Sequence, residues 1–90
     1  MITNDQIVQA IYQTEGASVT KHPYGIKQTF KHTSPEQACL NTVLHAERTY
    51  HMVKVDRAFI YYLADIYCPP QTDKEGNKNW KVNMIQILHL

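Results

Sequence analysis

The stretch TSPEQACLNTVLHAERTYHM, residues Thr33–Met52, carries the clearest helix signal in the chain. Ser34 can cap the first turn with its hydroxyl, and Pro35 fits the first helical position because no N–H donor is needed there. The Glu-Gln pair that follows completes a turn similar to a capping box. The pattern predicts a helix from Pro35 to His51 with an apolar stripe at helical spacing: Cys39, Leu40, Val43, Leu44, Ala46 and Tyr50.

Upstream of this helix, the sequence predicts one shorter helix and a long connection. Ile7, Val8 and Ile11 repeat at helical spacing, and a Thr-Asn pair before them supplies candidate caps, so we expect a helix from Asp5 to Thr14. Residues 17–33 show no regular pattern and contain the turn signal Pro-Tyr-Gly, so they are predicted to be irregular.

Downstream, two more helices are predicted. Asp56 is a candidate cap for RAFIYYLADIYCPP, in which Phe59, Ile60, Leu63, Ile66 and Tyr67 form the apolar stripe and the double proline ends the helix. The polar run QTDKEGNK is predicted to be a surface loop. The closing stretch NWKVNMIQILHL is predicted to be a fourth helix capped by Asn79, with its apolar face made of Trp80, Met84, Ile87 and Leu88.

These elements predict an all-α fold: one compact domain, residues 1–90, of about four helices with a long irregular loop after the first. Such a connection leaves room for a groove beside it. The apolar fraction of 43% and charged fraction of 19% are ordinary for a globular domain. No apolar run reaches the length of about 18 residues that a membrane span needs. The first residues are typical of a helix start, so we expect no signal peptide.

Composition also limits the partners and cofactors. The formal charge is +1 and the Lys and Arg residues are scattered, so nucleic-acid binding is not expected. Cys39 and Cys68 form no CxxC motif, and the five His residues show no metal-ligand spacing, so we expect neither a metal nor a cofactor. The two cysteines are predicted to be buried thiols, with a disulfide between helices as the alternative.

The residue of most chemical interest is Glu15, which lies where the first predicted helix ends. A carboxylate there meets the negative end of the helix dipole, a mildly unfavourable position. From spacing alone it is either a solvated helix-end carboxylate or a general acid in the groove beside the connection. Asp56 is assigned to a helix cap and Asp65 to the surface, so no second carboxylate is predicted to pair with it.

The stretch from Glu15 and Gly16 to the turn Tyr24-Gly25-Ile26-Lys27-Gln28 resembles the active-site stretch of the lysozyme-like superfamily, above all of lytic transglycosylase and goose-type lysozyme domains. In those domains a Glu ends a helix, and a turn similar to Gly-Leu-Met-Gln forms the floor of the sugar cleft. Lys27 stands where Met is usual. The stretches ACLNTV (38–43), FI…ADIYCPP (59–70) and NWKVN (79–83) resemble short lysozyme-like proteins of bacteria and phages, in the same order along the chain.

The resemblance implies cleavage of the β-1,4 bond between N-acetylmuramic acid and N-acetylglucosamine in peptidoglycan. It implies that Glu15 is the catalytic acid and base, and that the substrate meets five other positions: Tyr24, Gly25, Ile26, Gln28 and Tyr67. In related domains a Tyr at the position of Tyr67 hydrogen-bonds the catalytic Glu. From the residues alone, Tyr67 could instead be a core ring with its hydroxyl at the rim. Trp80 is predicted to belong to the core, because it lies on the buried stripe of the fourth helix.

Two other interpretations remain open. The chain could be a lysozyme-like module that binds glycan or a protein without cutting, as its small size, Lys27 and the missing second carboxylate suggest. A helical protein-interaction or DNA-binding domain is a third, weaker interpretation. Oligomeric state, and whether the products are anhydro sugars or hydrolysed sugars, are left undecided by the sequence.

Overall fold

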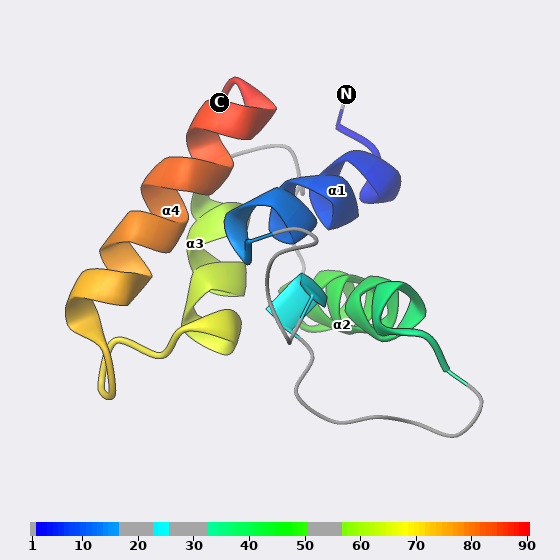
Figure 1. The fold of residues 1–90 in the computed structure, drawn as a ribbon, viewed down its shortest axis with the longest axis horizontal. Coiled ribbons are helices and arrows are strands. Elements are labelled where there is room, and N and C mark those ends of the chain that lie inside the picture. Colours follow the sequence, from blue (N-terminus) through cyan, green and yellow to red (C-terminus); the bar gives the residue numbers. More distant parts are fainter. Residues whose placement is uncertain (1, 17–22, 26–32, 51–56) are drawn as a thin grey trace.

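The computed structural model describes residues 2–16, 23–25, 33–50 and 57–90. These residues form four α-helices, α1 (Asn4–Thr14), α2 (Pro35–Tyr50), α3 (Arg57–Tyr67) and α4 (Lys74–Leu88), and one short 3-10 turn, η2 (Pro23–Gly25). No strand runs through these ranges. The predicted all-α fold is confirmed (Figure 1).

The start of α1 is a complete capping box. The hydroxyl of Thr3 accepts a hydrogen bond of 3.1 Å from the backbone N–H of Gln6, and the side chain of Gln6 accepts one of 2.8 Å from the backbone N–H of Thr3. Two of the N–H groups that a helix start leaves unsatisfied are therefore paired. The helix begins at Asn4, one residue before the predicted start.

The signals around Pro35 and the double proline were also interpreted correctly. Ser34 accepts a hydrogen bond of 3.1 Å from the N–H of Gln37, which fixes the first turn of α2. Helix α3 stops at Tyr67, just before the prolines that cannot continue it. The predicted cap Asp56 and the predicted last residue of the second helix, His51, lie outside the described residues.

The prediction for the start of α4 was wrong. The run QTDKEGNK is not all loop, because the helix begins at Lys74 and Asp73 is its cap, accepting a hydrogen bond of 2.8 Å from the N–H of Gly76. Asn79 is an exposed residue inside the helix and caps nothing. A polar composition hid this first turn, although Asp at the cap and Glu75 in the first turn are favourable helix-start chemistry.

The core lies where the four helices meet. Helix α1 packs against α2 and α4, α3 packs beside α4, and η2 lies between α1 and α2 (Figure 1). The radius of gyration is 12.3 Å, close to the value expected for a single folded domain of this length. Among the described residues, the buried apolar side chains are Ile7, Val8, Ala10, Ile11, Cys39, Val43, Ala46, Phe59, Ile60, Leu63, Ala64, Trp80 and Met84.

Two predicted core positions lie at the surface instead. Ile66 is 43% exposed and Ile87 is 41% exposed, although both fall on the apolar stripe of their helix. Each stripe is wider than the contact that its helix makes, so the flanking residue stays in solvent. None of the helices described is long and apolar enough to cross a membrane.

Candidate active site

Glu15 caps the C-terminal end of α1. Its backbone N–H makes the last helical hydrogen bond, 2.9 Å to the carbonyl of Ile11, and Gly16 then turns the chain with a φ of +99°. The side chain is half-buried and leaves the helix where the regular backbone ends. The predicted position of Glu15 at the end of the first helix is therefore confirmed.

Gly25 lies directly against the Glu15 carboxyl group. A Cβ atom on residue 25 would lie 3.1 Å from Cδ of Glu15 and 3.1 Å from Cδ1 of Tyr67. The φ of Gly25 is +69°, a backbone angle that residues other than glycine rarely adopt. The turn therefore approaches the Glu15 carboxyl group closely at a residue without a side chain. A side chain on residue 25 would displace the carboxyl group or the ring of Tyr67.

Trp80 of α4 holds the same carboxyl group from another side. Its indole Nε1–H donates a hydrogen bond of 2.9 Å to Oε1 of Glu15, and its ring stacks on Tyr67 with centroids 5.4 Å apart and planes 16° apart. Trp80 is 5% exposed, so its predicted place in the core is confirmed. Its contact with Glu15 was not predicted, because no local pattern links residues 65 positions apart.

The hydroxyl of Tyr67 donates to Sγ of Cys39 at 3.2 Å and not to Glu15 as the resemblance implied. Burial is the main cause that raises the pKa of the Tyr67 phenol far above its usual range and the pKa of the Cys39 thiol to about 11. Both groups are therefore neutral at physiological pH. No charge is therefore carried at that pH by the indole that donates to Glu15, by the phenol stacked on this indole, or by the thiol that the phenol contacts.

Tyr24 stands in an unusual backbone conformation beside this group. Its φ is +62°, uncommon for a bulky residue, and its ring lies 4.6 Å from the ring of Tyr12, centroid to centroid. Its hydroxyl donates to Oε2 of Glu36 at 3.4 Å. Burial and then the Glu36 charge raise the pKa of Tyr24. The predicted site positions Ile26 and Gln28, and Lys27 between them, lie outside the described residues.

The other residues considered for chemistry have structural partners. Asp65 is exposed and accepts a hydrogen bond of 3.1 Å from Nδ2 of Asn77, a buried residue that also donates to the carbonyl of Cys68 at 2.8 Å. This contact ties the end of α3 to α4. Neither Cys39 nor Cys68 forms a disulfide, and Cys39 is buried whereas Cys68 is half-buried. Within the described ranges, no cluster of three or more His, Cys, Asp or Glu side chains could hold a metal ion.

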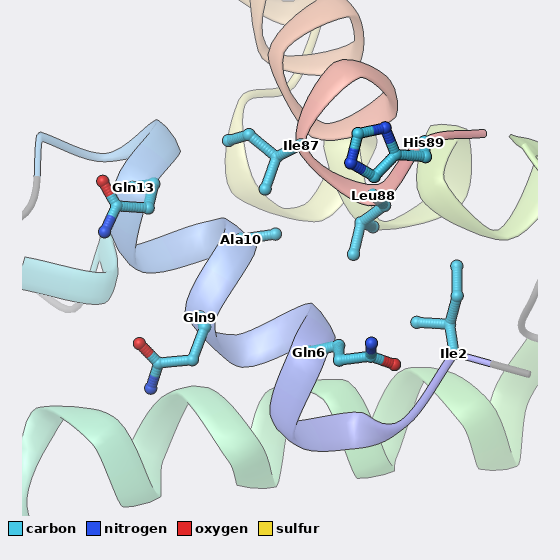
Figure 2. A pocket seen from close by; sticks show the side chains of 8 residues that line it. All are labelled: Ile2, Gln6, Gln9, Ala10, Gln13, Ile87, Leu88 and His89. Atoms are coloured by element: carbon cyan, nitrogen blue, oxygen red, sulfur yellow. The ribbon is translucent and has the colours of Figure 1, made fainter.

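A pocket of about 250 Å³ lies elsewhere, between α1 and the last turn of α4 (Figure 2). Gln6, Gln9 and Gln13 of α1 line one side, and Ile87, Leu88 and His89 line the other. Glu15, Tyr67 and Trp80 are not part of it. This pocket was not predicted from the sequence, because its two walls come from opposite ends of the chain.

Comparisons of the chain with protein-family models, with curated proteins and with solved structures found no match. The resemblance to lysozyme-like domains therefore rests on the motifs in the sequence, and the chemistry of the site rests on the contacts around Glu15.

Proposed function

We propose that this protein cleaves peptidoglycan as a lysozyme-like glycosidase, with Glu15 as the single general acid and base. One observation carries the proposal: Gly25 lies so near the Glu15 carboxyl group that a Cβ atom on residue 25 would be 3.1 Å from Cδ of Glu15. These are the catalytic position and the cleft-floor position that the sequence resemblance implies. Tyr67, another implied position, lies on the same side of Gly25, since its Cδ1 would be 3.1 Å from that Cβ atom.

The chemistry follows from one carboxyl group that gives and then takes back a proton. Protonated Glu15 donates its proton to the glycosidic oxygen as the bond between N-acetylmuramic acid and N-acetylglucosamine breaks. The carboxylate left behind accepts a proton from the 6-hydroxyl of the muramic residue, which closes a 1,6-anhydro ring. If water attacks instead, the carboxylate takes the proton of that water and the product is a reducing sugar.

The surroundings of Glu15 suit this cycle. The indole N–H of Trp80 holds one carboxyl oxygen of Glu15 at 2.9 Å, and the ring of Trp80 is held in turn by its stacking on Tyr67. Ile26 and Gln28 belong to the same cleft floor in the sequence resemblance.

The test is the release of soluble fragments from dye-labelled peptidoglycan sacculi. Wild-type protein is expected to release dye, and Glu15→Gln is expected to release none above background. Glu75→Gln is the matched control, because Glu75 is an exposed carboxylate in the first turn of α4. Equal release by Glu15→Gln and wild type would contradict the proposal. Wild-type protein that is folded and sediments with sacculi, but releases nothing, would be a binding module.

A further inference from the structure

We infer that Trp80 is the positioning residue of Glu15: its indole N–H fixes one carboxyl oxygen and leaves the other to exchange the proton. This inference rests on the proposed function for the proton exchange. The contact itself, Nε1 of Trp80 to Oε1 of Glu15 at 2.9 Å, is a short hydrogen bond to a group that is ionised for part of the cycle.

The donor is itself held in place by the core. Trp80 stacks on Tyr67, and the hydroxyl of Tyr67 donates to the fully buried Cys39. The series Glu15, Trp80, Tyr67 and Cys39 therefore runs through α1, α4, α3 and α2. A carboxylate at a helix end would otherwise sample several rotamers, whereas a donor locked by packing on rigid helices restricts it to one.

An indole is a suitable donor for this purpose. Its Nε1–H donates a hydrogen bond but has no lone pair that could accept a proton. Trp80 can therefore orient Glu15 and stabilise its ionised state without competing for the proton that Glu15 must deliver. A Tyr or His in this place could both donate and accept, and would make the protonation state of the pair ambiguous.

The test must separate Glu15 from the other titratable groups packed near it. Cys39 of α2 and Tyr67 of α3 stay neutral to alkaline pH because burial raises the pKa of each. The charged group of α2 on this side is Glu36, which accepts from Tyr24 of η2. The carboxyl groups among these described neighbours are Glu15 and Glu36, and a separate variant removes each one.

The sequence contains a single Trp, so one indole N–H signal in a ¹H–¹⁵N NMR spectrum reports on this contact. In wild-type protein and in Glu75→Gln, the signal is expected to shift on acidification through the range in which carboxyl groups titrate. In Glu15→Gln the acceptor oxygen remains but no longer titrates, so that shift is expected to disappear. In Glu36→Gln the shift is expected to persist.

The functional half of the test uses Trp80→Phe, which keeps a ring on Tyr67 and removes the donor. It is expected to release soluble fragments from sacculi roughly tenfold more slowly than wild type, because misplacing a reacting group is costly. Glu75→Gln, the matched control, is expected to release fragments at the wild-type rate, because Glu75 is exposed in the first turn of α4. Both must show the wild-type helical circular dichroism spectrum.

Two results would overturn the inference. One is an indole N–H chemical shift that still changes on acidification in Glu15→Gln. The other is a folded Trp80→Phe variant that releases fragments from sacculi at the wild-type rate. The NMR arm needs no enzymatic activity. If wild-type protein releases nothing from sacculi, the proposed function fails on its own, and the indole signal still decides whether Trp80 holds Glu15.

Discussion

A Cβ atom on residue 25 would lie 3.1 Å from the carboxyl carbon of Glu15, so the approach of Gly25 to Glu15 depends on the absence of a side chain. The same atom would lie 3.1 Å from the ring of Tyr67. Distances of this kind are tighter than ordinary van der Waals contact, so a substitution must move one of the two neighbours. A side chain on residue 25 would therefore displace either Glu15 at the end of α1 or Tyr67 at the end of α3.

Replacing Gly25 by Ala is expected to lower both stability and activity. The positive φ and the crowding together are expected to reduce the free energy of unfolding by about 1–3 kcal/mol. The displaced Glu15 is expected to slow release of fragments from sacculi. Urea unfolding and the dye-release assay measure the two effects.

Gly25→Asn separates the two causes. Asn tolerates a positive φ better than Ala, but it brings the same Cβ atom against Glu15 and Tyr67. It is expected to be more stable than Gly25→Ala and similarly slow. An Ala variant with wild-type stability and wild-type release would show that the crowding is of no consequence.

The start of α4 gives a second prediction. Asp73→Ala removes the acceptor for the N–H of Gly76 and is expected to lower the free energy of unfolding by about 1 kcal/mol. Asn79→Ala removes no cap and places a better helix former at an exposed helical position, so it is expected to be neutral or slightly stabilising. Thermal unfolding of both variants checks this, and the reverse order of stabilities would contradict the assignment of Asp73 as the cap.

The caps of the helices show how much of the fold could be predicted from the sequence. Local chemistry predicted α1, α2 and α3, since Thr3, Ser34 and the double proline act on the backbone within a few residues. It failed at Asp73, because Gly76 and a run of polar residues weakened the helix pattern there. The polar Asn77 in that run is buried for a tertiary reason, its hydrogen bonds to Asp65 and the carbonyl of Cys68.

The candidate site was predictable only in part. The position of Glu15 at a helix end follows from α1 alone, and the need for glycine at Gly25 follows from the turn. The hydrogen bond from Trp80 and the contact of Tyr67 with Cys39 depend on how helices pack, and no spacing in the sequence encodes them. The resemblance placed Tyr67 beside Glu15 but assigned its hydroxyl to the wrong partner.

The two cysteines are expected to differ in reactivity. Cys39 is fully buried and burial raises its pKa to about 11, so little thiolate is present and little of the sulfur is accessible at pH 8. Cys68 is half-buried and is expected to react with a thiol reagent first. Mass spectrometry of partly labelled protein tests the order. Labelling of Cys39 before Cys68 in folded protein would contradict the packing around Tyr67.

Stability is expected to fall at alkaline pH through Cys39. Its pKa is about 11 in the folded protein and 9.0 in the unfolded chain, so the folded state binds the proton more tightly. The stability that the thiol contributes is complete below pH 9 and is lost as the pH rises to about 11. Urea unfolding at pH 8 and pH 10.5 measures this loss.

Cys39→Ala provides the comparison for that measurement. The variant is expected to be less stable than wild type at pH 8, because a buried group is removed, but to lose less stability on going to pH 10.5. Cys68→Ala is the matched control and is expected to keep the wild-type loss. An equal loss in wild type and Cys39→Ala would mean that the Cys39 thiol does not contribute to alkaline destabilisation.

The central claim is that Glu15 alone performs acid and base catalysis on peptidoglycan. The most direct measurement is mass spectrometry of the soluble products after sacculi are incubated with wild-type protein, Glu15→Gln or Glu75→Gln. Muropeptides are expected with wild type and Glu75→Gln, and none with Glu15→Gln; masses lower by one water would indicate 1,6-anhydro products. Muropeptides released equally by folded Glu15→Gln would contradict this claim, as would their absence with folded wild-type protein.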